Sequence, residues 1–279
     1  MSAAQNDIRV EKKLAFGEAD GKPLLADLYA PADAQRPCAV FVFVHGGGWI
    51  AGSRASGEGL GRLLAAEGYA CLCIDYRLAR NGAPSYPGAL EDVRAALDFI
   101  GRDGASLGLD ASRIMLLGAS AGGHLSALAA LTEPLEAPRV RALVTVYGVF
   151  DLKTQWDHEI VVRPKGNLVE ALLGRSALED RRIYFEASPL SHVSLQRRKL
   201  PVFLGYGLQD EVTPHAQSEA FLLALSQCNF FVRKYVAADA GHFWLGEGLD
   251  DESSHGRRFL RAALAFLRGV GLQAKAPEG

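Results

Sequence analysis

A serine flanked by glycines in the pattern G-x-S-x-G occurs twice in the sequence, at Ser106 and at Ser120. A serine hydroxyl can act as a nucleophile on a tight turn between a strand and a helix, because small neighbours permit the turn that exposes it. Ser120 has this context, since it follows the apolar run 114–117 and precedes the helical stretch 123–131. Ser106 instead follows a helix and lies in a glycine-rich connection. We therefore predict that Ser120 is a catalytic nucleophile and that Ser106 is a loop residue.

Residues 45–49 read His-Gly-Gly-Gly-Trp and directly follow another apolar run. Consecutive glycines let the backbone turn sharply and present N–H groups to an external oxygen, as an oxyanion hole requires. A flexible loop and a phosphate-binding loop are the alternatives. No Lys-Ser/Thr pair follows, which excludes a P-loop, and the glycine spacing of a dinucleotide-binding fold is absent. We expect the oxyanion donors to be the N–H groups of Gly47, Gly48 and Ala121.

A serine nucleophile needs a base, which is most often a histidine. The seven histidines are His45, His124, His158, His192, His215, His242 and His255. His242 follows the last predicted strand, and catalytic groups gather in loops at the carboxyl ends of parallel strands. We predict His242 as the base, His124 as a packing residue on the helix after Ser120, and His45 as a support for the glycine loop.

The acid that orients the base should also follow a strand. Asp210 comes shortly after the apolar run 202–206 and is the preferred candidate. Glu211 is a close alternative, and Asp239, three residues before His242, is a weaker one. The order serine, aspartate, histidine along the chain is the order expected for a nucleophile elbow of this kind.

Five aromatic side chains could line an apolar substrate pocket, because ligand sites are mostly apolar with few polar groups. They are Trp49, Tyr147, Trp156, Phe243 and Trp244. The alternative is that these large rings belong to the hydrophobic core. Arg163 and Lys165 could meet an acidic substrate, but a solvated surface is the simpler interpretation.

The elements that must position these residues follow from the hydrophobic pattern. Two strands, 8–16 and 24–29, flank Asp20-Gly21, which is a hairpin signal. Six buried runs then alternate with helical stretches, as in a mainly parallel sheet. These runs are 39–44, 70–74, 113–117, 140–147, 202–206 and 231–236. One helix is predicted near 87–100 and another from about Ser253.

The segment 148–190 is too long for a simple connection between strands and is predicted to be an inserted cap or lid. The expected fold class is therefore α/β: an eight-stranded, mostly parallel sheet with helices on both faces and a short cap. The whole chain, residues 1–279, is expected to form one domain.

Composition excludes several function classes. The 279 residues are 49% hydrophobic and 22% charged, and 30 basic against 32 acidic residues give a net charge of −2. This balance argues against nucleic acid as a partner. The apolar run 38–44 is too short to cross a membrane. The polar N-terminus lacks a signal sequence, so a cytoplasmic location is expected.

The cysteines are few and scattered: Cys38, Cys71, Cys73 and Cys228. Cys71 and Cys73 should share one face of a strand as small buried side chains rather than metal ligands. We predict no metal and no organic cofactor. The expected partner is a small-molecule ester or amide substrate, and the oligomeric state stays open, with a homodimer among the alternatives.

With these residues assigned, the chain resembles the α/β-hydrolase superfamily, from about 39 to 268. Within it, the chain is similar to carboxylesterases related to hormone-sensitive lipase and to the BD-type feruloyl esterases. The motifs that carry the resemblance are His-Gly-Gly-Gly-Trp at 45–49, Asp-Tyr-Arg-Leu at 75–78, Ser-Ala-Gly-Gly-His at 120–124, Ala-Ser-Pro-Leu at 187–190 and Ala-Gly-His at 240–242. Arg80 stands where relatives of hormone-sensitive lipase usually carry proline, which favours the BD-type branch.

The resemblance implies a Ser120–His242–Asp210 triad with oxyanion donors at Gly47, Gly48 and Ala121. It implies a serine carboxylesterase that cleaves small to medium esters through an acyl-Ser120 intermediate. The glycine loop also resembles that of kynurenine formamidases, so an aryl-formamidase or amidase is the alternative. A non-catalytic ligand receptor on the same fold is the alternative from another class.

Overall fold

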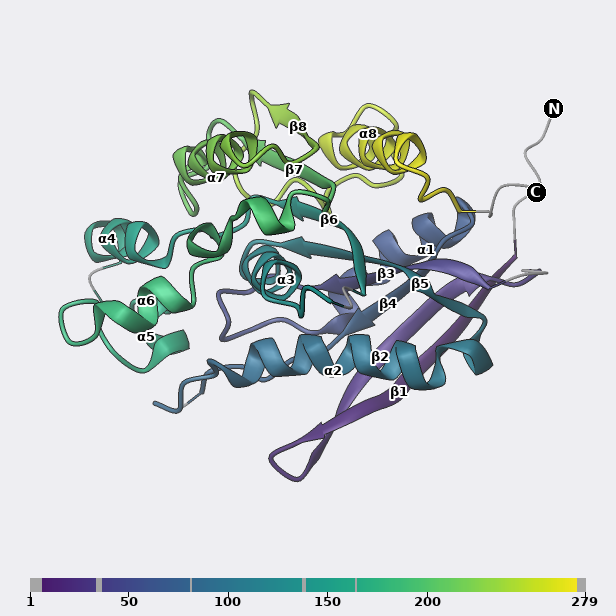
Figure 1. Cartoon of the computed structure of the whole chain (residues 1–279), viewed down its shortest axis with the longest axis horizontal. Coiled ribbons are helices and arrows are strands. Elements are labelled where there is room, and N and C mark those ends of the chain that lie inside the picture. The colour runs from purple at the N-terminus through teal and green to yellow at the C-terminus, as the bar shows by residue number, and fades with distance from the viewer. Residues whose placement is uncertain (1–6, 34–36, 81, 137–138, 164, 275–279) are drawn as a thin grey trace.

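The computed structural model describes residues 7–33, 37–80, 82–136, 139–163 and 165–274. Its centre is an eight-stranded sheet in the order β1-β2-β4-β3-β5-β6-β7-β8 (Figure 1). The strands are β1 (Ile8–Ala19), β2 (Lys22–Pro31), β3 (Cys38–Val44), β4 (Ala70–Ile74), β5 (Leu109–Ala119), β6 (Val140–Val146), β7 (Val202–Gly207) and β8 (Val232–Ala237). All eight predicted strands are confirmed.

The sheet is antiparallel at one edge and parallel elsewhere. The β1–β2 hairpin turns at Asp20 and Gly21, which both have positive φ angles, 51° and 71°. This is the backbone that a two-residue hairpin loop requires. β2 pairs antiparallel with β4, and β3 to β8 pair in parallel. The carboxyl ends of the parallel strands therefore lie along one edge of the sheet.

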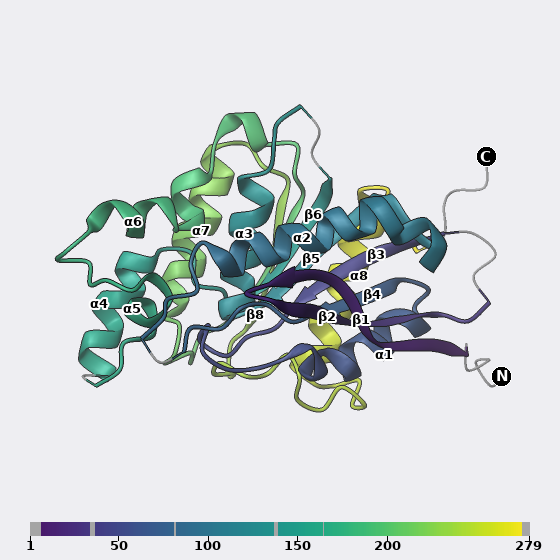
Figure 2. The same ribbon diagram turned by 90° about the horizontal axis from the view of Figure 1, so that it is seen from below.

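Helices cover both faces of the sheet. α2 (Gly88–Asp103), α3 (Ala121–Leu131) and α7 (His215–Gln227) pack on one face. α1 (Glu58–Ala66) and α8 (His255–Gly269) pack on the other (Figure 2). The predicted helices correspond to α2, α3 and α8, whereas α1 and α7 were not specifically located by the apolar spacing.

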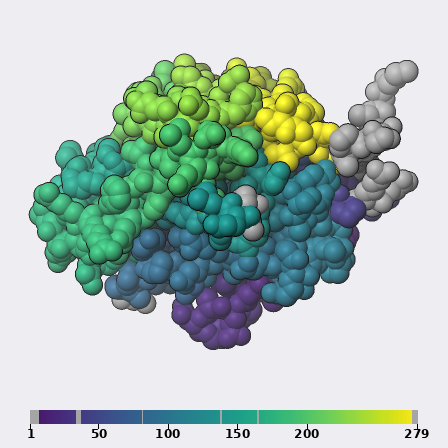
Figure 3. All heavy atoms as spheres, in the orientation of Figure 1, coloured from purple at the N-terminus to yellow at the C-terminus, as the bar shows by residue number. Residues whose placement is uncertain are grey.

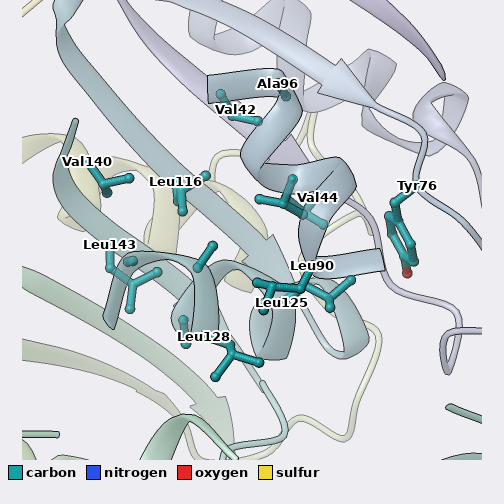
Figure 4. Close-up of a cluster of buried hydrophobic side chains, with 14 of the residues drawn as sticks. Val42, Val44, Tyr76, Leu90, Ala96, Leu116, Leu125, Leu128, Val140 and Leu143 are labelled. Atoms are coloured by element: carbon teal, nitrogen blue, oxygen red, sulfur yellow. The ribbon is translucent and has the colours of Figure 1, made fainter. Parts of the chain in front are cut away.

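The core follows the two-residue alternation of the strands. In β3, Val42 and Val44 face α2 and α3, whereas Phe41 and Phe43 face α1 and α8. Figure 4 shows side chains of the first face, with strand residues such as Leu116 beside α2 and α3. Because helices cover both faces, the central strands read as continuous apolar runs.

Three α-helices lie in the described part of the segment between β6 and β7. They are α4 (Leu152–Val162), α5 (Leu168–Leu173) and α6 (Arg181–Glu186). The side chains of Asp151, Asn167 and Asp180 accept hydrogen bonds from the first N–H groups of α4, α5 and α6. Such caps stabilise short helices, which nucleate poorly alone. The segment, teal to green, gathers at one end of the molecule (Figure 3).

Cys71 and Cys73 lie on one face of β4, as predicted, with their sulfur atoms 3.7 Å apart and both side chains buried. The hydrogen bond with the Cys71 thiol, together with burial, raises the pKa of Cys73, which keeps it protonated. Among the described residues, no three His, Cys, Asp or Glu side chains form a group that could hold a metal ion. None of the helices in these ranges is long and apolar enough to cross a membrane.

Candidate active site

Ser120 lies on a sharp turn between β5 and α3. Its φ and ψ angles are 54° and −121°, a strained conformation for a residue with a side chain. Glycines make the turn sterically possible. A Cβ at Gly118 would lie 2.2 Å from the carbonyl oxygen of Gly122, and one at Gly122 would lie 2.0 Å from that of Val44. The spacing G-x-S-x-G therefore reflects close packing of β5, α3 and β3 around the serine.

The structure brings His242 and Asp210 to this serine. The Ser120 Oγ is 2.8 Å from His242 Nε2, and His242 Nδ1 is 2.7 Å from Asp210 Oδ2. The side chains of His242 and Asp210 are almost fully buried, at 2% and 1% exposure. The other oxygen of Asp210 accepts hydrogen bonds from the N–H groups of Val212 and Thr213, at 2.9 and 2.8 Å. Both carboxylate oxygens are thus fixed in direction.

Two aromatic rings flank His242. The ring of Tyr147, which follows β6, lies 4.5 Å from the imidazole, centroid to centroid. Phe243 meets the imidazole edge-on at 4.8 Å and is 67% exposed. Burial raises the pKa of Tyr147, so its phenol stays neutral and serves as a packing surface for the imidazole. Of the five predicted pocket residues, Tyr147 and Phe243 are the two beside the site.

The glycine loop lies against the serine turn. A Cβ at Gly46 would be 3.2 Å from the Cβ of Ser120. Gly47, Gly48 and Trp49 have positive φ angles of 121°, 59° and 60°. The N–H groups of Gly47 and Gly48 donate to no acceptor among the described residues. The N–H of Ala121 has no acceptor within α3, because the first N–H groups of an α-helix lack intrahelical partners.

His45 supports this loop, as predicted. Its imidazole stacks on Tyr76 at 4.3 Å, and its Nδ1–H donates to the Gly46 carbonyl at 2.6 Å. The Tyr76 hydroxyl donates to the carbonyl of His45 at 3.0 Å. Burial lowers the pKa of His45, which favours the neutral ring.

His124 joins three parts of the structure. Trp49 Nε1–H of the glycine loop donates to His124 Nδ1 at 3.2 Å, and His124 Nε2–H donates to the Ala187 carbonyl at 2.8 Å. Complete burial lowers the pKa of His124 to about 4, so the ring is neutral and can accept on one nitrogen and donate on the other. The prediction that His124 packs agrees with this geometry.

Four of the five predicted pocket residues are buried, Tyr147 among them, and the other three have partners away from the serine–histidine pair. Trp49, Trp156 and Trp244 are at most 5% exposed. Trp49 bonds to His124, and Trp156 Nε1–H donates to Glu170 Oε1 at 2.7 Å. Trp244 packs edge-on against Tyr147 and Phe259. Their rings are therefore held by partners within the fold.

Leu168, at the start of α5, lies at the site although no motif in the sequence includes it. A Cβ at Gly48 would lie 2.7 Å from Leu168 Cδ1, so this leucine covers the glycine loop. No pattern in the sequence signals the contact, because it joins segments 120 residues apart through an irregular insertion.

The alternative candidates lie away from the serine–histidine pair. Ser106 Oγ–H donates to the Asp103 carbonyl within a short 3₁₀ turn. The Glu211 side chain is exposed. The carboxylate of Asp239 is 2.9 Å from His255 Nε2 and 82% exposed. Of the three acidic candidates, the structure brings Asp210 to His242.

The chain is similar in sequence to proteins that are named as esterases. Esterase LipC of Mycobacterium tuberculosis is 34% identical over an alignment of 223 positions, which covers 76% of this chain and 54% of LipC. A probable isoprenylcysteine α-carbonyl methylesterase, ICMEL1, of Oryza sativa subsp. japonica is 32% identical over 78% of this chain and 53% of its own length. The chain thus spans about half the length of these curated relatives.

Solved structures share the fold. A truncated carbohydrate esterase from gut microbiota matches with a TM-score of 0.78 and 20% identity, over 95% of this chain and 98% of its own. Propionate-bound Est2 of Thermogutta terrifontis matches with a TM-score of 0.75 and 23% identity, over 99% and 97% of the two chains. The BD-FAE family model matches residues 26–225, a range that includes Ser120 and Asp210. The chain therefore belongs to the BD-FAE family and has the α/β-hydrolase fold.

Proposed function

We propose that this chain is a serine hydrolase that cleaves carboxylic esters of small to medium size. The observation that carries the proposal is the continuous hydrogen-bonded series from Ser120 Oγ through the His242 imidazole to the Asp210 carboxylate. A nucleophile, a base and a group that orients the base are the minimal parts of acyl transfer through serine.

In the first step, Ser120 Oγ attacks the ester carbonyl carbon while His242 Nε2 takes its proton. The carbonyl oxygen becomes an oxyanion, which the N–H groups of Gly47, Gly48 and Ala121 stabilise by hydrogen bonds. Asp210 holds the imidazole tautomer and favours the imidazolium that forms. The tetrahedral intermediate then collapses, and His242 Nε2–H protonates the leaving alcohol as its C–O bond breaks.

The second step repeats the same chemistry with water. His242 removes a proton from a water molecule that attacks the carbonyl carbon of acyl-Ser120. The same N–H groups donate hydrogen bonds to the new oxyanion. When the second tetrahedral intermediate collapses, His242 returns the proton to Ser120 Oγ and the carboxylic acid leaves. Over the cycle the ester and one water molecule become an alcohol and a carboxylic acid, and Ser120 and His242 return to their starting protonation states.

We propose an ester rather than an amide as the substrate, because the relatives named above are esterases. We further propose that residues 148–190 form the cap of the site. Leu168 of this segment lies over Gly48, and the Ala187 carbonyl accepts from His124. Leu168 and Phe243 would then offer apolar surface to the acyl and alcohol groups of the substrate.

The direct test is hydrolysis of a short-chain p-nitrophenyl ester by the wild type, by Ser120→Ala and by Ser106→Ala. Ser106 is the matched control, since it occupies the other G-x-S-x-G pattern. We expect Ser120→Ala to lose at least about 10³-fold in kcat and Ser106→Ala to retain wild-type turnover. N-formylkynurenine measured in parallel separates an esterase from a formamidase. Absence of turnover on both substrates, or full activity in Ser120→Ala, would overturn the proposal.

A further inference from the structure

A chain of hydrogen bonds with a buried centre connects residues 208–214, here called the acid loop, to the segment that covers the glycine loop. It starts at Val212, whose N–H donates to Asp210 Oδ1 at 2.9 Å. The carbonyl oxygen of the same residue accepts a hydrogen bond from Gln155 Nε2 of α4 at 3.0 Å. The position of Val212 is thus fixed from both sides, by the catalytic acid and by a side chain of α4.

Hydrogen bonds on both sides fix the orientation of the Gln155 side-chain amide. Its Oε1 accepts from Gln217 Nε2 at 2.7 Å, and the Oε1 of Gln217 accepts from the N–H groups of Phe150 and Asp151. The Nε2 of Gln155 therefore faces its two acceptors, Val212 O and Glu159 Oε1, the latter at 3.0 Å. Gln155 and Gln217 are 2% and 3% exposed, so this network lies within the protein.

Glu159 continues the chain toward the glycine loop. Its Oε2 accepts from the N–H groups of Leu168 and Val169 at 2.6 and 3.3 Å, while its Oε1 accepts from Gln155. Glu159 is only 2% exposed. A buried carboxylate costs desolvation energy that an apolar residue would not, so its presence calls for a role in fixing geometry.

The last link is the side chain of Leu168, which covers Gly48. Since Leu168 Cδ1 lies where a Cβ of Gly48 would clash, displacing the start of α5 changes the contact on the glycine loop. One path of contacts, buried at Gln155 and Glu159, therefore joins Asp210, at one end of the proposed triad, to the proposed oxyanion donors.

We propose that Gln155 and Glu159 are positioning residues. Through α4, they fix the position of the acid loop relative to the glycine loop. The proposal rests on the proposed function of the site. Positioning acts on the chemical step more than on substrate binding, because a displacement of about 1 Å in a catalytic group can cost about 10²-fold in rate. The cap would thus contribute to catalysis as well as to the walls of the site.

The test compares Gln155→Met and Glu159→Gln with Asp157→Asn. Asp157 is a matched control on α4, because its exposed carboxylate pairs with Lys153 one turn away and has no part in the network. We expect both network variants to lower kcat on a p-nitrophenyl ester by about 10- to 100-fold with KM within about twofold. Asp157→Asn should keep wild-type constants.

Amide hydrogen exchange supplies a readout that does not depend on turnover. We expect faster exchange in both segments, 208–214 and 166–170, in each network variant. Exchange that rises only beside the substituted residue would refute the coupling. An unchanged kcat in folded Gln155→Met and Glu159→Gln would show a purely structural role. If the wild type hydrolyses no ester, the proposed function fails, whereas the exchange result still decides whether the two loops are coupled.

Discussion

At the scale of single residues, Asp210 is the group whose substitution tests the assignment of the acid. Asp210→Asn keeps the size of the side chain but offers an amide instead of a full carboxylate to His242 Nδ1, 2.7 Å from Oδ2. An amide N–H toward Nδ1 would hold the wrong imidazole tautomer, with its proton on Nε2. We expect kcat to fall by about 10⁴-fold. Steady-state kinetics with an activated ester provide the measurement.

Glu211→Gln is the control for this substitution, because Glu211 neighbours Asp210 and its side chain is exposed. It should retain wild-type kcat. A large loss in Glu211→Gln together with a small loss in Asp210→Asn would exchange their roles.

The three proposed catalytic residues could be predicted because each combines a suitable side chain with the end of a parallel strand. Strand ends of a parallel sheet converge on one edge whatever the details of packing. The aromatic residues could not be assigned in this way. Trp49 is buried, and His124, 75 positions away, accepts its indole N–H. The need for that partner is invisible in the local pattern of either residue.

At the scale of elements, the serine turn depends on how closely β3, β5 and α3 approach one another. Gly122→Ala would place a Cβ 2.0 Å from the backbone oxygen of Val44, which side-chain rotation cannot relieve. We expect the unfolding free energy to fall by about 3 kcal/mol, at the upper end of the cost of overpacking. Denaturant unfolding provides the measurement.

Gly101→Ala is the matched control, since a Cβ at Gly101 of α2 would meet no atom within 4 Å. It should raise the unfolding free energy by about 1 kcal/mol, because alanine is the better helix former. Equal effects of the two substitutions would mean that the close approach at Gly122 does not limit the fold.

Strands were easier to predict than helices for a physical reason. The central strands are covered on both faces, so each reads as an apolar run. α7 buries Gln217 and Ser218 beside Phe221 and Leu225, which interrupts its apolar spacing. α5 and α6 have only six residues each, too few for a helical period to emerge. Their capping residues, Asn167 and Asp180, are the local signals that could have located them.

At the scale of the whole molecule, ion pairs connect the antiparallel strands β1 and β2 to the parallel part of the sheet. Asp27 of β2 accepts from Lys12 of β1 at 3.2 Å and from Arg54 at 2.9 Å. Arg54 also pairs with Asp75, which directly follows β4. Burial alone would raise the pKa of Asp27, but hydrogen bonds from Lys13 N–H, Arg54 and Lys12 outweigh it and hold the pKa below its usual value. This carboxylate therefore loses its stabilising effect only in strong acid, below about pH 4.

The buried histidines create a separate and milder acid sensitivity. The pKa of His124 is lowered to about 4 by burial, and the pKa of His45 is lowered for the same reason. As the pH falls below about 6.5, the unfolded chain binds protons at these positions before the folded protein does. The stabilising effect of the neutral rings is complete above pH 6.5 and is lost progressively toward pH 4. One histidine contributes a slope of at most about 1.4 kcal/mol per pH unit.

His124→Gln tests this dependence, because a glutamine amide can accept from Trp49 and donate to Ala187 but does not titrate. Denaturant unfolding of both proteins should be measured at intervals between pH 4 and 7. We expect the unfolding free energy of the variant to fall less steeply with acidification than that of the wild type, the remaining slope including that of His45. Parallel curves would contradict the assignment of a neutral, buried His124. A shallower curve would mean that acid weakens the link between the glycine loop, α3 and the 148–190 segment before it disrupts the ion pairs of the sheet.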